Sequence, residues 1–111
     1  MIIDKDGNNT TIITQEKASV IELVKKIDIL YDRFKNNNII VNITKLDDVK
    51  LSDIAEFLQL SKKHRKAKHS FVVVSNSANL DEMPDEIIVV PTTREAFDVI
   101  EMEVMERDLG F

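Results

Sequence analysis

Residues able to do acid–base or metal chemistry are few and scattered in this chain. The two histidines, His64 and His69, lie within one basic run, and neither has carboxylates at the spacing of a metal site. Two acidic pairs, Asp47-Asp48 and Asp85-Glu86, lie in predicted loops. Paired carboxylates do acid–base work only where their surroundings shift their pKa values, and nothing in the sequence indicates such a shift. We therefore predict no catalytic residue and no metal ligand.

The cysteine and glycine content excludes further classes of site. Cysteine is absent, which excludes disulfides, thiolate metal sites and cysteine nucleophiles, and fits a reducing compartment. Gly7 and Gly110 are the only glycines, so no glycine-rich phosphate loop is present. A Ser-His-Asp set assembled from distant residues stays open. The expected protein is a non-enzyme without a cofactor.

Ser52 is the hydroxyl that stands out, because it precedes a run of apolar residues at helical spacing. A serine in that place caps the helix and is worth about 1 kcal/mol relative to alanine. A phosphate on the same oxygen would lie at the positive end of the helix and add about two negative charges. Residue chemistry alone favours the capping role.

Charge is unevenly distributed along the chain. Residues 1–80 carry 13 basic and 10 acidic residues, whereas residues 81–111 carry 2 and 10, for a net charge of −5. The basic run at 62–69 is interpreted as a helix C-terminus or, alternatively, as an anion-binding surface. The acidic C-terminal helix is interpreted as a solvated face or, alternatively, as a partner-binding face. A net acidic chain with one short basic run argues against nucleic-acid binding.

The first half of the chain predicts a hairpin, a helix and a buried strand. Turn formers at 6–9 separate residues 1–4 from 10–14, which predicts an edge hairpin with Gly7 at a positive φ. Ser19 and Glu22 have capping-box spacing, and helical periodicity continues to residue 34. The asparagines at 36–38 then end the helix in a left-handed cap. Residues 39–43 are nearly all apolar and β-branched, as in a strand covered on both faces.

The second half continues the alternation of strands and helices. It predicts a helix from about 52 to 67, strands at 70–74 and 87–90, and a last helix capped by Thr92 with Glu95. The order β-β-α-β-α-β-α predicts one α/β domain over residues 1–111, a mixed sheet with helices packed on it. No apolar run approaches the roughly 20 residues of a membrane span, and no signal-peptide pattern is seen. We expect a soluble cytoplasmic protein with no membrane partner.

This order of elements resembles a STAS domain, the fold of bacterial anti-sigma-factor antagonists. The resemblance covers roughly residues 10–105. It rests on the strand–loop–helix segment at 39–58 and on the closing stretch IIVVPTTREAFDVI. It implies a STAS-like sheet and a non-catalytic regulatory module that binds a protein, such as an anti-sigma factor or a kinase-like regulator.

The family's regulatory segment, Asp-Ser-Ser/Thr-Gly at a helix start, aligns with residues 50–53. Ser52 matches the serine that an anti-sigma kinase phosphorylates, whereas Lys50, Leu51 and Asp53 replace the acid, the first serine and the glycine. Asp53 adds negative charge beside the phosphate acceptor. The resemblance thus implies a partner surface at Lys50, Ser52, Asp53 and Glu56, with Ser52 as the candidate phosphorylation site.

Other roles stay open. The chain also resembles small STAS-like bacterial proteins that end in an acidic helix and a DLGF-type tail, some of them associated with ribonuclease Z. Loops 44–51 and 75–84 follow two neighbouring strands and would form a small-ligand crevice at the carboxyl edge of the sheet. An apolar edge near the hairpin would support a dimer, but the sequence leaves the oligomeric state open.

Overall fold

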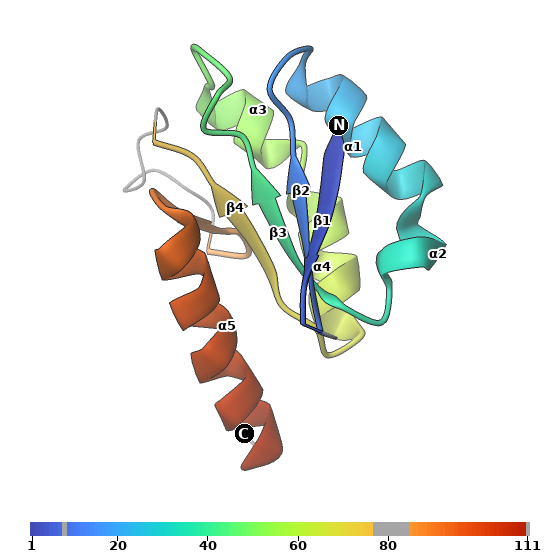
Figure 1. Ribbon diagram of the computed structural model, residues 1–111, viewed down its shortest axis with the longest axis vertical. Coiled ribbons are helices and arrows are strands. Elements are labelled where there is room, and N and C mark those ends of the chain that lie inside the picture. The colour runs from blue at the N-terminus through green and yellow to red at the C-terminus, as the bar shows by residue number, and fades with distance from the viewer. Residues whose placement is uncertain (8, 77–84, 111) are drawn as a thin grey trace.

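A computed structural model of the chain describes residues 1–7, 9–76 and 85–110 and shows a five-stranded sheet between helices (Figure 1). The strands lie side by side in chain order. They are β1 (Ile2–Asp6), β2 (Thr10–Thr14), β3 (Asn38–Asn42), β4 (Phe71–Val74) and β5 (Ile88–Val90). β1 is antiparallel to β2, and all other neighbours are parallel. The predicted α/β class and mixed sheet are confirmed. The architecture is compatible with a STAS-like fold without being specific to it.

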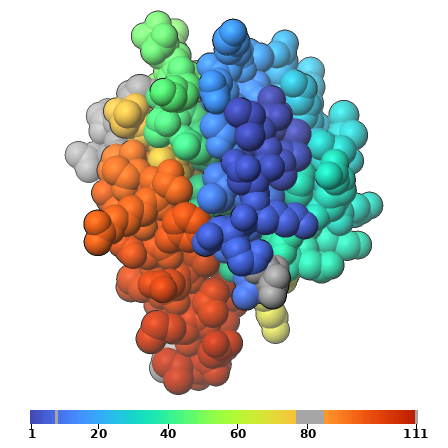
Figure 2. Space-filling view, viewed as in Figure 1, coloured from blue at the N-terminus to red at the C-terminus, as the bar shows by residue number. Residues whose placement is uncertain are grey.

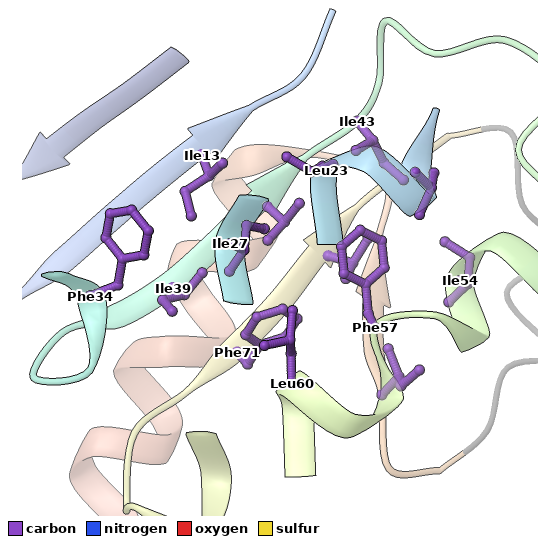
Figure 3. Packing of buried hydrophobic residues seen from close by; sticks show 14 of the residues in the cluster. Ile13, Leu23, Ile27, Phe34, Ile39, Ile43, Ile54, Phe57, Leu60 and Phe71 are labelled. Atoms are coloured by element: carbon purple, nitrogen blue, oxygen red, sulfur yellow. The ribbon is translucent and has the colours of Figure 1, made fainter. Parts of the chain in front are cut away.

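Helices cover both faces of the sheet. One face carries α1 (Val20–Ile29), α2 (Tyr31–Phe34), α3 (Leu51–Ala55) and α4 (Leu58–Lys66), and the other carries α5 (Thr93–Asp108). Alternate residues of β3 serve the two sides: Ile39 and Val41 join the larger cluster under α1–α4, and Ile40 joins the smaller one under α5. Figure 3 shows the larger cluster. The prediction that residues 39–43 are covered on both faces is therefore confirmed for β3.

The N-terminal hairpin forms as predicted, with Gly7 at a φ of +65° in its turn. β1 is the edge strand, as expected. The hairpin joins the sheet through β2, which pairs in parallel with β3. Thr11 and Ile13 are fully buried as a result.

Both predicted long helices on the α1–α4 face are broken in two. The first stops at Leu30, whose ψ of 8° leaves the helix, and restarts at Tyr31. The predicted asparagine cap is also wrong, because none of the asparagines at 36–38 has a positive φ. Asn38 already belongs to β3. The second helix divides at Glu56 and Phe57. Ile54 in α3 and Phe57 at the break both point into the core, where each is fully buried (Figure 3).

α5 lies over β3, β4 and β5 and leaves the hairpin side of that face without a helix. Its buried residues include Ala96 and Ile100, as predicted, whereas Met102 and Met105 are exposed. Thr92 caps it by accepting a hydrogen bond from the Glu95 amide at 3.1 Å, also as predicted. Within the part of the chain that the structure describes, no helix has the length and apolarity needed to cross a membrane.

Candidate functional site

The predicted partner residues lie on and beside α3, at the end of the sheet where the parallel strands finish (Figure 1). We call Lys50, Leu51, Ser52, Asp53 and Glu56 the α3 surface. All are exposed except Asp53, which is partly buried. The structure therefore places two of the four residues predicted from sequence in one short helix and the other two, Lys50 and Glu56, at its ends.

The start of α3 differs from the prediction. Lys50, not Ser52, is the N-cap residue, and the Asp53 carboxylate accepts a hydrogen bond from the Lys50 amide at 2.9 Å. The Lys50 carbonyl in turn accepts from the Asp53 and Ile54 amides at 2.9 and 3.1 Å. Ser52 is thus the second residue of the helix and makes no cap. The capping prediction for Ser52 is wrong, because the N-cap is Lys50, two residues earlier, where the Asp53 carboxylate accepts from the backbone amide.

This arrangement predicts unequal effects of two neighbouring substitutions. Asp53→Ala should lower the free energy of unfolding by about 1 kcal/mol, because it leaves the Lys50 amide without its carboxylate. Ser52→Ala should change it by less than about 0.5 kcal/mol. Urea unfolding followed by circular dichroism measures both variants. A larger loss for the Ser52 variant would show that the serine is the cap after all.

The loop before α3 is pinned at both of its ends. The Asn42 side chain accepts hydrogen bonds from the Thr44 amide and hydroxyl at 3.0 and 2.8 Å. Near the other end, Val49 is buried in the larger cluster, and Asp48 takes a φ of +53°. The α3 surface is therefore held in a defined position relative to the sheet. The predicted crevice between this loop and the loop at 75–84 lies mostly outside the described residues.

Two hollows border the α3 surface on the side of α1. Asp53 lines a small one of about 250 Å³ with Ser19 and Asp47. Glu56 lines a larger one of about 620 Å³ with Lys25 and Lys63. Asp53 and Glu56 therefore have different neighbours. The side chain of Leu51, in the same surface, is 42% exposed. The sequence analysis did not name Leu51 as a partner residue; it noted only that Leu51 replaces the first serine of the family's segment.

His64, from the basic run, is a core residue and not a surface charge. It is fully buried, accepts a hydrogen bond from the Tyr31 hydroxyl at Nδ1 (2.7 Å) and donates from Nε2 to the Asn37 carbonyl (2.6 Å). Because the carbonyl can only accept, Nε2 carries a proton, and the neutral ring then leaves Nδ1 to accept from the Tyr31 hydroxyl. Burial lowers the pKa of His64 to about 4, although the bond to Asn37 opposes that shift.

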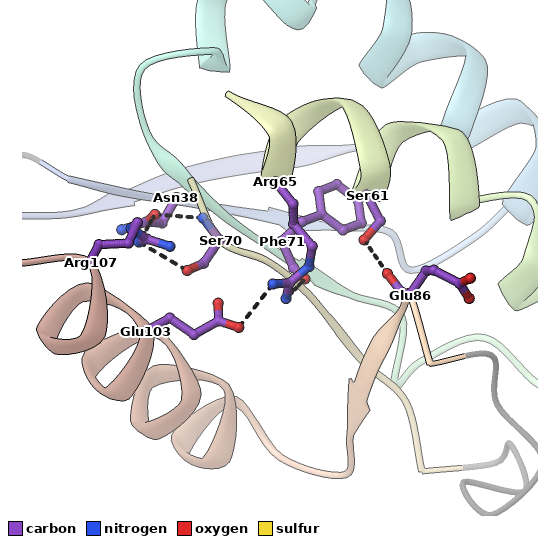
Figure 4. Close-up of polar contacts among 8 residues, drawn as sticks. All are labelled: Asn38, Ser61, Arg65, Ser70, Phe71, Glu86, Glu103 and Arg107. Atoms are coloured by element: carbon purple, nitrogen blue, oxygen red, sulfur yellow. Dashed lines mark hydrogen bonds and ion pairs between the residues drawn. The ribbon is translucent and has the colours of Figure 1, made fainter. Parts of the chain in front are cut away.

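Some other charged residues of the basic run and of α5 also have structural partners. The run does form the last turn of α4, as the helix-end interpretation predicts. Arg65 donates to Glu103 of α5 at 2.9 Å and to the Phe71 carbonyl at 3.3 Å (Figure 4). Glu103 is therefore not on a solvated face, and the interpretation of the acidic helix as purely solvated is wrong for this residue.

A second arginine contact joins α5 to the amino ends of β3 and β4. Arg107 Nη2 donates to Ser70 Oγ at 3.2 Å and to Asn38 Oδ1 at 3.4 Å (Figure 4). The same Asn38 oxygen accepts from the Ser70 amide at 2.8 Å. These residues come from segments far apart in sequence, and no local pattern links them. Sequence reasoning therefore missed this end of the sheet.

The described residues contain no cluster of three or more His, Cys, Asp or Glu side chains that could hold a metal ion. Comparisons with protein-family models and with curated proteins find no match to this chain.

Proposed function

We propose that this protein is a non-catalytic interaction module of STAS type that binds a regulatory protein through the α3 surface. The observation that carries the proposal is the exposed Leu51 on a helix that is fixed in place. Lys50 and Ser52 flank it, and Glu56 follows one turn later. An apolar side chain within a polar rim is a common centre of protein–protein contacts.

The attachment of α3 to the core supports this role. Ile54 and Phe57 are fully buried and attach the helix to the core, and the preceding loop is held by Asn42. A surface held in place loses little conformational entropy on binding. The proposed partner class is an anti-sigma factor or a kinase-like regulator.

Ser52 is proposed as a modification site within the same surface. Its side chain is exposed and is not used by the helix cap. A phosphate there would add about two negative charges beside Asp53. Modification would therefore change the charge of the surface on which the partner docks.

The proposal predicts that Leu51→Arg abolishes partner binding while the fold is kept. Removing one central apolar contact and placing a charge there should weaken affinity by at least about 30-fold. Ile29→Arg is the matched control, because Ile29 on α1 is 80% exposed and lies outside the α3 surface. The measurement is retention of partner proteins by the immobilised chain, compared across the two variants.

The outcome separates specific docking from general stickiness. We expect the wild-type chain and the Ile29 variant to retain the same protein, and the Leu51 variant to lose it. Equal retention by both variants, or no retained protein with the wild-type chain, would contradict the proposal. Circular dichroism and urea unfolding confirm that both variants are folded.

A further inference from the structure

A groove of about 710 Å³ lies at the opposite end of the sheet from the α3 surface. Its walls are the turn between β1 and β2, the segments that lead into β3 and β4, and the C-terminal half of α5. Figure 2 looks onto this face, with α5 (orange to red) beside the hairpin (dark blue). The volume is in the range of sites for small organic molecules, about 300–1,000 Å³.

One wall of the groove is a strip of α5 that changes from apolar to cationic. Phe97, Ile100 and Val104 precede Arg107 along the strip, at helical spacings of three or four residues. Phe97 and Arg107 are ten residues apart, which is about 15 Å along a helix. A ligand that follows the strip is therefore elongated, with an apolar body and a polar end.

Three nitrogen-bearing side chains meet at the Arg107 end. Lys68 and His69 line the groove with Arg107, and the arginine is close enough to help lower the pKa of His69, after burial as the main cause. Toward the described residues, Arg107 donates hydrogen bonds from Nη2 alone, to Asn38 and Ser70. Its other N–H groups are therefore available to a carboxylate.

Lys68 has an unusual backbone conformation. It has a φ of +68°, a conformation that glycine adopts at low cost just after a helix end. The lysine side chain thus lines the groove despite a backbone position that favours glycine. Asp6 and Glu101 also line the groove, and their charges would repel a ligand with several negative charges.

We propose that this groove binds an elongated organic monoanion, with its carboxylate at Arg107, Lys68 and His69 and its apolar body along Phe97, Ile100 and Val104. The site is separate from the α3 surface and does not depend on the proposed partner binding.

3-Phenylpropionate is the probe that tests this proposal, with the neutral 3-phenylpropan-1-ol as its matched control. We expect saturable binding of the acid in an NMR titration, with amide shifts at His69, Val104 and Arg107. The alcohol should bind at least about tenfold more weakly, because it lacks the charge. Absence of saturable binding in the millimolar range, equal binding of acid and alcohol, or shifts elsewhere would each overturn the proposal.

Variants at two exposed lysines test the cationic end without endangering the fold. Lys68→Gly removes the charge at a backbone position suited to glycine, and should weaken 3-phenylpropionate binding about fivefold. Lys45→Gln removes a charge from the loop before α3 and should leave the affinity unchanged. Equal affinities of the wild type and the Lys68 variant for 3-phenylpropionate would show that Lys68 does not contact the carboxylate, and would contradict the proposed position of that carboxylate.

Discussion

Phe57→Ala is expected to lower the free energy of unfolding by about 3–5 kcal/mol. Phe57 is fully buried between α3 and α4, and its ring lies 6.2 Å from that of Phe71. Truncation removes buried apolar area and leaves a cavity that the surrounding sheet cannot close. A domain of this size has a total stability of about 5–15 kcal/mol, so the variant should be close to unfolding.

Urea unfolding measures this effect, and Phe57→Leu is the control. Leucine keeps most of the volume, so we expect a loss of only about 1–1.5 kcal/mol. A loss below about 1.5 kcal/mol for the alanine variant would show that the two helices are not held through this ring. The result also bears on the α3 surface, because Phe57 is one of the two residues that attach α3 to the core.

Acidification is the second change with a large expected effect, through His64. Its pKa is about 4 in the folded chain and about 6.5 when the ring is solvated. Above pH 6.5 both states hold the neutral ring, and the stability is complete. As the pH falls below 6.5 the unfolded state gains a proton first, so stability is lost down to about pH 4. By pH 5 the loss should be about 2 kcal/mol.

The free energy of unfolding between pH 7.5 and 5 tests this expectation. Ordinary carboxyl pKa values are about 4, so most Asp and Glu side chains stay ionised between pH 7.5 and 5. His64→Gln should be less stable at pH 7.5, because it disturbs the bonds to Tyr31 and Asn37, but its stability should vary less with pH. His69→Gln should keep most of the wild-type slope. A flat wild-type profile, or an unchanged slope in the His64 variant, would contradict the assignment.

Sequence predicted the strands well because their residues leave few alternatives. The β-branched runs at 39–43 and 70–74 are too short for buried helices and too apolar for loops, and both became central strands. The caps at Ser19 and Thr92 were also correct, because each serine or threonine has its acceptor role fixed by local spacing.

The broken helices were not predictable from periodicity. Leu30 and Phe57 both continue the apolar pattern, so nothing local marks the break. Tyr31 and Phe34 are buried after the first break and Phe57 at the second, so the apolar pattern records burial and not the continuity of the helix. The Ser52 cap failed because the helix begins earlier, with Lys50 as its N-cap and the Lys50 amide bonded to the Asp53 carboxylate.

Four of the five residues of the α3 surface were named from sequence, whereas the groove was not predicted. Lys50, Ser52, Asp53 and Glu56 are close in sequence, so a strand–loop–helix pattern is enough to bring them together. The groove is assembled from four separate segments that only the sheet order places side by side. Contacts between segments that are far apart in the sequence leave no periodic pattern in a single sequence.

The central claim is that a regulatory protein docks on the α3 surface, and NMR mapping of the labelled chain with its captured partner tests it most directly. We predict that the amides of Leu51, Ser52 and Glu56 shift or broaden on saturation, while those of α5 stay unchanged. Changes confined to α5 or the hairpin, with the α3 amides unaffected, would contradict the claim.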